Sequence, residues 1–327
     1  MERRRLGRNG LQVSRLGLGT MTWGRDTDQH EAGDQLRAFL DAGGTLVDTA
    51  AAYGEGESER VLGSLLGSVV PRDEVVVATK AGIVRSGSSR SVDTSRRALL
   101  DELDRSLHRL DTDHVDLWQV HTWSWEAPLE ETLTALDFAV STGRARYVGI
   151  SNYTGWQTAQ AATWQAAWPG RAPVASTQVE YSLLERGVER EVLPAALELG
   201  LGVLAWSPLG RGVLTGKYRT GTPADSRAAA AHYASFVEKY LNADAARVVT
   251  AVATAAEGLG LAPLEVALAW VRDRPGVSSV LVGARTAAQL VGSLASEGVE
   301  LPDEIRGALD EVSRPVGGYP EHGRDQR

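Results

Sequence analysis

The chain of 327 residues contains no cysteine, which excludes disulfides, thiolate nucleophiles and cysteine-ligated zinc or iron–sulfur centres. It also lacks any uninterrupted run of about 20 apolar residues, the length that a membrane-spanning helix needs. The basic start of the chain is not followed by the apolar segment of a secretory or twin-arginine signal. We therefore expect a cytoplasmic protein with no membrane partner.

An excess of positive charge is missing as well. The 42 acidic residues outnumber the 34 lysines and arginines, and the formal net charge of −8 argues against a nucleic-acid partner. The 6 histidines are scattered, and only His121 ends a strand-like run, which argues against a metal site and against a metal-dependent hydrolase. Hydrophobic residues make up 43% of the chain, so it can bury a large core without disulfides or metals.

Two kinds of segment alternate over nearly the whole chain. The short apolar runs that predict strands are residues 14–19, 45–49, 74–80, 115–121, 145–151, 174–180, 202–206 and 277–283. The longer segments that predict helices are residues 28–42, 57–66, 93–110, 129–142, 155–168, 188–199, 264–272 and 286–294. In 93–110, Leu99, Leu103 and Leu107 share one helix face, and Asp93 stands at the expected N-cap. The alternation is typical of parallel strands joined by crossover helices.

Eight strand–helix units predict a (β/α)8 (TIM) barrel, with residues 1–327 as a single domain. An open, doubly wound sheet with a second domain is the alternative at this point. Asn9-Gly10 favours a tight turn within residues 4–13, so we expect an N-terminal β-hairpin that plugs the bottom of the barrel.

Two segments depart from the repeat. Residues 208–242 are a long, Gly-rich and polar connection after the seventh strand, and a connection of that length is typical of a functional loop. Extra helices are expected after it, at residues 244–257, and at the C-terminus, from Pro302.

Titratable side chains stand at the ends of successive strands, where a barrel has its active site. Asp48, Lys80 and His121 follow the second, third and fourth strands, and Tyr53 lies shortly after Asp48. Singly they read as a helix cap, a solvated cation or a half-buried aromatic ring. Together they suit a proton donor: the ammonium lowers the pKa of the phenol, the carboxylate holds the lysine, and the imidazole hydrogen-bonds a carbonyl oxygen.

Six short motifs at successive strand ends resemble the aldo-keto reductase superfamily, and the resemblance covers almost the whole chain. They are Leu46-Val47-Asp48-Thr49-Ala50 with Tyr53-Gly54, Ala78-Thr79-Lys80, Gln119-Val120-His121, Gly149-Ile150-Ser151-Asn152, residues 206–212 and residues 282–286. The resemblance implies a catalytic tetrad of Asp48, Tyr53, Lys80 and His121. It also implies the reduction of a small-molecule aldehyde or ketone to an alcohol, with NADPH as cofactor and Tyr53 as general acid.

The same resemblance implies a set of cofactor contacts. In the family, residues at the positions of Ser151, Asn152 and Gln178 hold the carboxamide, and Trp206 takes the place of a ring that stacks on the nicotinamide. The whole set is Gly19, Thr20, Met21, Asp48, Ser151, Asn152, Gln178, Trp206, Ser207, Pro208, Leu209, Gly210, Arg211, Gly212, Lys217, Arg227, Gly283, Ala284, Arg285, Gln289 and Ser293.

The choice of NADPH over NADH depends on Arg285. A guanidinium after the eighth strand can pair with a 2′-phosphate, whereas a mere surface arginine at a helix start is poorly placed. Ala284 and Ser293 replace the Ser or Thr and the Asn that the family often has nearby. No Gly-x-Gly-x-x-Gly follows the first strand, so a Rossmann site is not indicated.

Three tryptophans follow strand ends and indicate the substrate. Trp23, Trp123 and Trp125, together with Tyr53 and His121, predict an aromatic-walled pocket for an apolar, aromatic or sugar-like carbonyl. His121 stands where relatives that reduce steroid double bonds have a glutamate, which favours carbonyl reduction. Two alternatives stay open: a cofactor-binding, redox-sensing protein like the β subunits of voltage-gated potassium channels, and a keto-deoxysugar reductase. Self-association stays open too.

Overall fold

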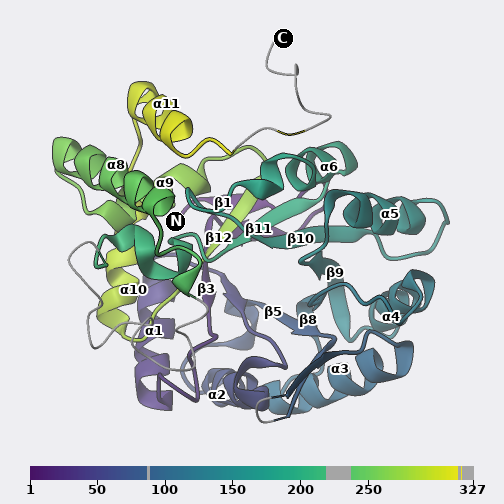
Figure 1. Cartoon of the computed structure of the whole chain (residues 1–327). Coiled ribbons are helices and arrows are strands. Elements are labelled where there is room, and N and C mark those ends of the chain that lie inside the picture. The colour runs from purple at the N-terminus through teal and green to yellow at the C-terminus, as the bar shows by residue number, and fades with distance from the viewer. Residues whose placement is uncertain (87–88, 219–236, 316–317, 319–327) are drawn as a thin grey trace.

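A computed structural model describes residues 1–86, 89–218, 237–315 and 318. Eight parallel strands close into a barrel at its centre (Figure 1). In barrel order they are β3 (Leu16–Gly19), β4 (Leu46–Asp48), β5 (Val76–Ala81), β8 (Val115–Val120), β9 (Ala145–Ser151), β10 (Val174–Glu180), β11 (Gly202–Trp206) and β12 (Val277–Gly283). The pairing of Val280 in β12 with Leu16 in β3 closes the barrel. The predicted (β/α)8 fold is confirmed, and an open sheet is excluded.

Helices pack around the outside of the barrel, as Figure 1 shows. They are α1 (Gln29–Asp41), α2 (Glu57–Leu65), α3 (Arg96–Leu110), α4 (Leu129–Ser141), α5 (Gly155–Ala166), α6 (Val192–Leu199), α8 (Ala243–Leu259), α9 (Pro263–Arg272), α10 (Ala287–Leu294) and α11 (Asp303–Val312). Leu99, Leu103 and Leu107 of α3 are buried, as the stripe predicts. The expected N-cap is wrong: the Ser95 side chain accepts from the Ala98 amide, while Asp93 accepts from Ser95.

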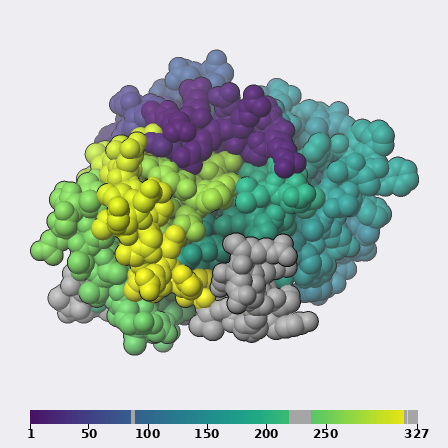
Figure 2. Space-filling view, turned by 90° about the horizontal axis from the view of Figure 1, so that it is seen from above, coloured from purple at the N-terminus to yellow at the C-terminus, as the bar shows by residue number. Residues whose placement is uncertain are grey.

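The predicted N-terminal hairpin closes the amino end of the barrel. Strands β1 (Arg3–Arg5) and β2 (Gln12–Ser14) pair antiparallel. Leu6 and Val13 are fully buried against apolar side chains of six barrel strands. Gly7 has a φ of +69°, and a Cβ there would collide with the Gly200 carbonyl, so only glycine fits this approach. Figure 2 shows the purple N-terminal segment beside the yellow-green C-terminal part of the chain.

A second hairpin, which the sequence patterns do not predict, follows β5 at the opposite end. It consists of β6 (Ile83–Ser86) and β7 (Ser89–Val92). Its residues are mostly exposed, so they carry no buried stripe from which a strand could be inferred.

The connection after β11 begins with a short helical turn, η4 (Gly210–Thr215), and the predicted extra helices are present as α8 and α11. Within the described ranges, no single helix is long and apolar enough to cross a membrane. Only α8 and α9 taken together, bent by 102°, reach that length and composition.

Candidate active site

A buried ion pair lies at the carboxyl end of the barrel. The Lys80 ammonium is 2.6 Å from Asp48 Oδ2, and it also donates to the Thr49 carbonyl over 2.8 Å. Asp48 is the last residue of β4 and Lys80 the last but one of the neighbouring strand β5, and both side chains are almost fully buried. Because a charge buried alone is very unfavourable, each of the two holds the other in place.

Tyr53 stands next to this pair, on the turn η1 (Tyr53–Gly56) that follows β4. Its hydroxyl is 3.5 Å from Lys80 Nζ, and the ammonium lies 5.1 Å from the centre of its ring. The His121 ring follows β8 and meets the Tyr53 ring edge-on, with 5.9 Å between the centroids. The four residues expected to form the tetrad are therefore brought together around one phenol.

Two glutamines fix the second oxygen of the carboxylate. Gln178 Nε2 is 2.8 Å and Gln119 Nε2 is 3.4 Å from Asp48 Oδ1. Sequence reasoning missed Gln119. It lies two residues before His121 on β8, so both point to the same side of the strand, and this spacing was the available signal.

The pKa of Tyr53 is raised above its usual 10.0 because burial outweighs the stabilisation of the phenolate by Lys80, while Asp48 also raises it. The expectation of a net lowered pKa is therefore wrong, although the contribution of Lys80 has the expected sign. Burial by itself would lower the pKa of Lys80, but Asp48 and then Tyr53 raise it above 10.5. The lysine is cationic and the phenol is protonated at neutral pH.

His121 is held by its backbone and stays uncharged. Its amide donates to the Ala81 carbonyl over 2.8 Å, and its carbonyl accepts from Asn152 Nδ2 over 2.9 Å. Burial lowers its pKa well below 6.5, and Lys80, Arg90 and Arg85 add to the effect. A neutral imidazole carries one N–H that can donate to a carbonyl oxygen. Within the described part of the chain, its buried Nδ1 has no hydrogen-bond partner.

A cavity of about 1260 Å³ opens over these residues at the barrel mouth. Most of the expected cofactor residues border it: Gly19, Thr20, Met21, Asp48, Ser151, Asn152, Gln178, Trp206, Ser207, Pro208, Leu209, Arg211, Gly212, Lys217, Gly283, Ala284, Arg285, Gln289 and Ser293. Gly210 lies beneath this lining, buried against Leu184, and Arg227 lies outside the described residues. A cavity of this size accommodates a dinucleotide beside a small substrate.

Hydrogen bonds hold the wall formed by β9, β10 and β11. Ser151 Oγ donates to the Gln178 carbonyl over 2.9 Å, and Trp206 Nε1 donates to Asn152 Oδ1 over 3.1 Å. Asn152 thereby links the Trp206 indole to the backbone of His121. These amide, hydroxyl and indole groups fit a nicotinamide ring with its carboxamide, and the sequence predicted their approximate place.

The loop after β11 is tied down by Arg211. Its guanidinium pairs with the Glu180 carboxylate at 2.9 and 2.7 Å, while Lys239 and the Tyr240 hydroxyl reach the same carboxylate. Sequence reasoning missed Glu180, which ends β10. Arg211 therefore anchors the loop that borders the cavity.

Backbone strain is concentrated at the cavity. Among the described residues, five that are not glycine have a positive φ, and four of them border the cavity. These four are Glu55, Asn152, Ser207 and Arg211. Strained backbone of this kind persists where the surroundings impose it, and it is frequent at functional sites.

Arg285 and the start of α10 also border the cavity. The Thr286 side chain caps α10, and the Arg285 amide donates to Gln289 Oε1 over 3.0 Å. A guanidinium beside a helix N-terminus suits a phosphate, because both present donors and positive charge. The donor set therefore fits the adenosine-phosphate end of a dinucleotide.

The predicted aromatic wall is not present. Tyr53 and His121 border the cavity, but Trp23 is fully buried and donates to Gln35 Oε1 over 3.0 Å. Trp123 packs edge-on against Trp125, and Trp125 is 80% exposed. These side chains lie away from the cavity because they pack against partners elsewhere in the fold. The sequence alone does not reveal those partners. Ile83, Arg85 and Arg90 of the β6–β7 hairpin border the cavity instead.

In the parts of the chain that the structure describes, no three His, Asp or Glu side chains come together in a way that could hold an ion.

Comparison with known proteins agrees with the geometry. The model of the Aldo/keto reductase family matches residues 15–314. The "Uncharacterized oxidoreductase YrpG" of Bacillus subtilis (strain 168) is 36% identical, over 97% of this chain and 98% of its own length. "Aldo-keto reductase YhdN" of the same organism is 33% identical, over 89% of this chain and 87% of its own length.

A relative of another description matches equally well. The "Probable voltage-gated potassium channel subunit beta" of Oryza sativa subsp. japonica is 37% identical, over 90% of both chains. These matches confirm the resemblance that the strand-end motifs carried.

Proposed function

We propose that this chain, which belongs to the aldo/keto reductase family, reduces an aldehyde or ketone to an alcohol with NADPH and with Tyr53 as proton donor. Family membership and the oxidoreductase relatives support a general oxidoreductase activity on small molecules and a nicotinamide cofactor. The observation that carries the finer proposal is the buried Lys80–Asp48 pair, 3.5 Å from the Tyr53 hydroxyl at the cavity.

Each tetrad residue has a separate task in this proposal. The carbonyl oxygen of the substrate lies between the Tyr53 hydroxyl and the His121 imidazole, and both donate hydrogen bonds to it. As negative charge develops on that oxygen, Tyr53 transfers its proton and becomes a phenolate beside the Lys80 ammonium. Asp48 keeps Lys80 in place, and its own position depends on Gln178. A proton donor must be protonated, and the raised pKa of Tyr53 ensures this at neutral pH.

The cofactor supplies the hydride when it is bound. Ser151, Asn152 and Gln178 would hold its carboxamide, and the Trp206 indole, fixed by Asn152, would face its ring. Arg285 supports NADPH over NADH because a guanidinium can pair with the 2′-phosphate.

Fluorescence titration with NADPH and NADH, followed by cofactor oxidation with a set of aldehydes and ketones, tests the proposal. We expect tight NADPH binding and turnover. Absence of NADPH binding would overturn the proposal.

The cofactor preference is tested by Arg285→Ala. We expect the Kd for NADPH to rise by about tenfold and that for NADH to change by less than about twofold, because only NADPH carries the 2′-phosphate. Arg247→Ala on the exposed face of α8 is the control, since Arg247 lies outside the cavity lining. Equal losses for both cofactors would contradict a 2′-phosphate contact.

The rice relative supports a second candidate, a cofactor-binding regulatory protein of the channel β-subunit type. Tight NADPH binding without turnover of any carbonyl would favour this candidate over the reductase.

A further inference from the structure

Two arginines of the β6–β7 hairpin point to one side of it. Arg85 and Arg90 are directly opposite each other in the antiparallel register. Side chains alternate between the two faces of a strand, so Arg85 shares its face with Ile83, whereas Val84 points to the other face and is 46% exposed. Ile83, Arg85 and Arg90 all border the cavity, so the face that carries both arginines is the cavity face.

Like charges directly opposite each other on a hairpin destabilise it. Among the residues that the structure describes, neither Arg85 nor Arg90 has an ion pair or hydrogen bond with an acid. Many other arginines of this acidic protein have one, such as Arg211 with Glu180. The pair thus places two positive charges on the cavity face without an ion pair among the described residues, and stability does not explain it.

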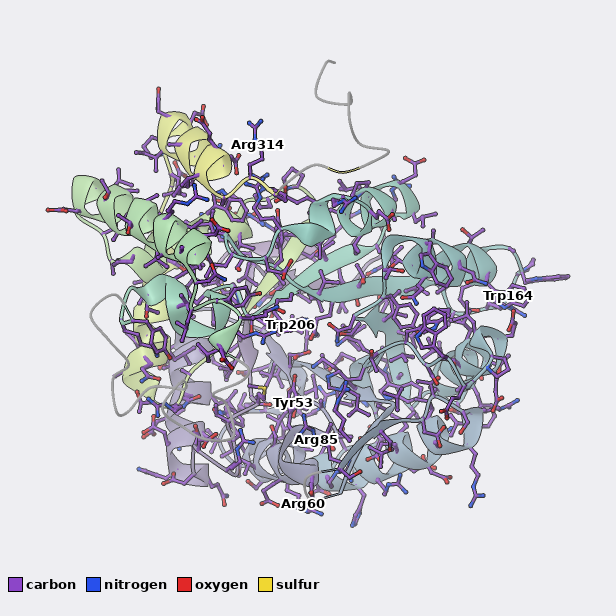
Figure 3. All side chains as sticks on the ribbon, viewed as in Figure 1. Tyr53, Arg60, Arg85, Trp164, Trp206 and Arg314 are labelled. Atoms are coloured by element: carbon purple, nitrogen blue, oxygen red, sulfur yellow. The ribbon has the colours of Figure 1, made fainter. Side chains whose placement is uncertain are left out.

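The position of the hairpin separates this charge from the cofactor groups. In barrel order, β5 lies opposite β11, and the hairpin follows β5. Lys217 follows β11 and Arg285 follows β12, so the groups suited to cofactor phosphates lie across the mouth. Figure 3 shows Tyr53 between Trp206 on one side and Arg85 on the other.

Tyr53 and His121 are the nearest reacting groups to the hairpin. Barrel neighbours of β5 are β4 and β8, which lead to Tyr53 and His121 respectively. The positive charges of Arg85 and Arg90 contribute to lowering the pKa of His121. A substrate whose carbonyl oxygen reaches Tyr53 can therefore extend its other end toward the two guanidinium groups.

We propose that Arg85 and Arg90 form a subsite for an anionic oxygen group, carboxylate or phosphate, on the carbonyl substrate. This rests on the proposed carbonyl reduction. Guanidinium groups pair with both anions in two-point hydrogen bonds. The substrate class is thus aldehydes or ketones with an acidic substituent, in place of the apolar, aromatic or sugar-like carbonyls that the tryptophans predicted.

The test compares two aldehydes of nearly equal shape, 4-carboxybenzaldehyde and its neutral amide, 4-carbamoylbenzaldehyde. We expect the native protein to favour the carboxylate in kcat/KM. Arg85→Gln and Arg90→Gln should each lower the carboxylate-to-amide ratio by about tenfold, since each removes one charge-assisted contact. A general effect on the tetrad would change both aldehydes alike and leave the ratio unchanged. 4-Formylphenyl phosphate serves as a third substrate. The anionic aldehyde whose kcat/KM falls by the larger factor in the glutamine variants identifies the anion that the subsite takes.

Arg97→Gln is the matched control. Arg97 is an exposed arginine on α3, outside the cavity lining, so the ratio should stay as in the native protein. An unchanged ratio in Arg85→Gln and Arg90→Gln, with turnover intact, would overturn the subsite and leave the reductase proposal standing.

Calorimetric titration with benzoate and benzamide separates the two proposals if turnover is absent. Preferential benzoate binding that both glutamine variants weaken would support the subsite while the reduction fails. Equal binding of benzoate and benzamide to the native protein would overturn the subsite whether or not the protein turns over.

Discussion

The two ends of the barrel are made from the same eight strands but differ in chemistry. At the amino end, Leu6 and Val13 of the N-terminal hairpin are fully buried in an apolar cluster. At the carboxyl end, a lysine and an aspartate are buried together, and four of the five described non-glycine residues with positive φ border the cavity there. The β1–β2 hairpin packs Leu6 into the barrel at the amino end, whereas the β6–β7 hairpin places Arg85 and Arg90 at the cavity.

This difference shows where the fold is stabilised and where it is used. Apolar burial at the amino end stabilises the native state and needs no particular chemistry. Buried charges, positive φ angles and opposed arginines at the mouth each oppose stability, so a function has to account for them. Substitutions at the two ends should therefore separate activity from stability.

Replacing Tyr53 by Phe should give the largest effect on activity. The ring and its edge-on contact with His121 remain, but the proton donor is lost, so kcat should fall by about 10²- to 10⁴-fold. NADPH binding, measured by fluorescence, should stay within about twofold, since this binding does not need the proton. Parallel losses of binding and turnover would show that Tyr53 acts as a structural residue.

Replacing Lys80 by Met should affect both activity and stability, because this residue at the barrel mouth also has a structural role. It leaves the Asp48 carboxylate buried without its cation, which should lower the free energy of unfolding by about 3–5 kcal/mol in urea denaturation. The double variant Lys80→Met with Asp48→Asn should regain much of that stability but not the activity. Recovery of turnover in the double variant would contradict a role for the ammonium beside Tyr53.

The sequence predicted the barrel well because its signal is local. The run at residues 145–151 became β9 (Ala145–Ser151), in which the consecutive residues 148–151 are buried on both faces of the sheet. The rule that barrel chemistry lies at carboxyl strand ends then placed Asp48, Lys80 and His121 together without any coordinates.

What the sequence did not predict depends on pairing across the fold. Gln119 reaches Asp48 because of the strand register. Trp23 is buried away from the barrel mouth, where its indole N–H donates to Gln35. The net pKa of Tyr53 depends on how deeply the folded chain buries it. The hairpin with Arg85 and Arg90 is exposed and polar, so neither strand period nor hydrophobicity marked it.

Replacing Leu6 by Ala tests the amino end. Leu6 is fully buried, so the cavity left behind should lower the free energy of unfolding by about 2–5 kcal/mol, measured in urea. The kcat of the folded variant should be close to that of the native protein. A kcat loss as large as that of Tyr53→Phe would mean that the two ends are coupled and that the comparison fails.

The pH profile should show the smallest effect, a plateau. As the acid, Tyr53 must be protonated, so kcat/KM is lost as the pH rises through its pKa, which lies above 10.0. His121 must be neutral to present a single N–H in a buried site, so activity is lost as the pH falls through its pKa, well below 6.5. Between these limits, from about pH 7 to 9, kcat/KM should be constant. A fall of kcat/KM inside this pH range that is absent in Tyr53→Phe would show that the phenol titrates near neutrality. The effect of Lys80 on the pKa of Tyr53 would then be larger than the effect of burial.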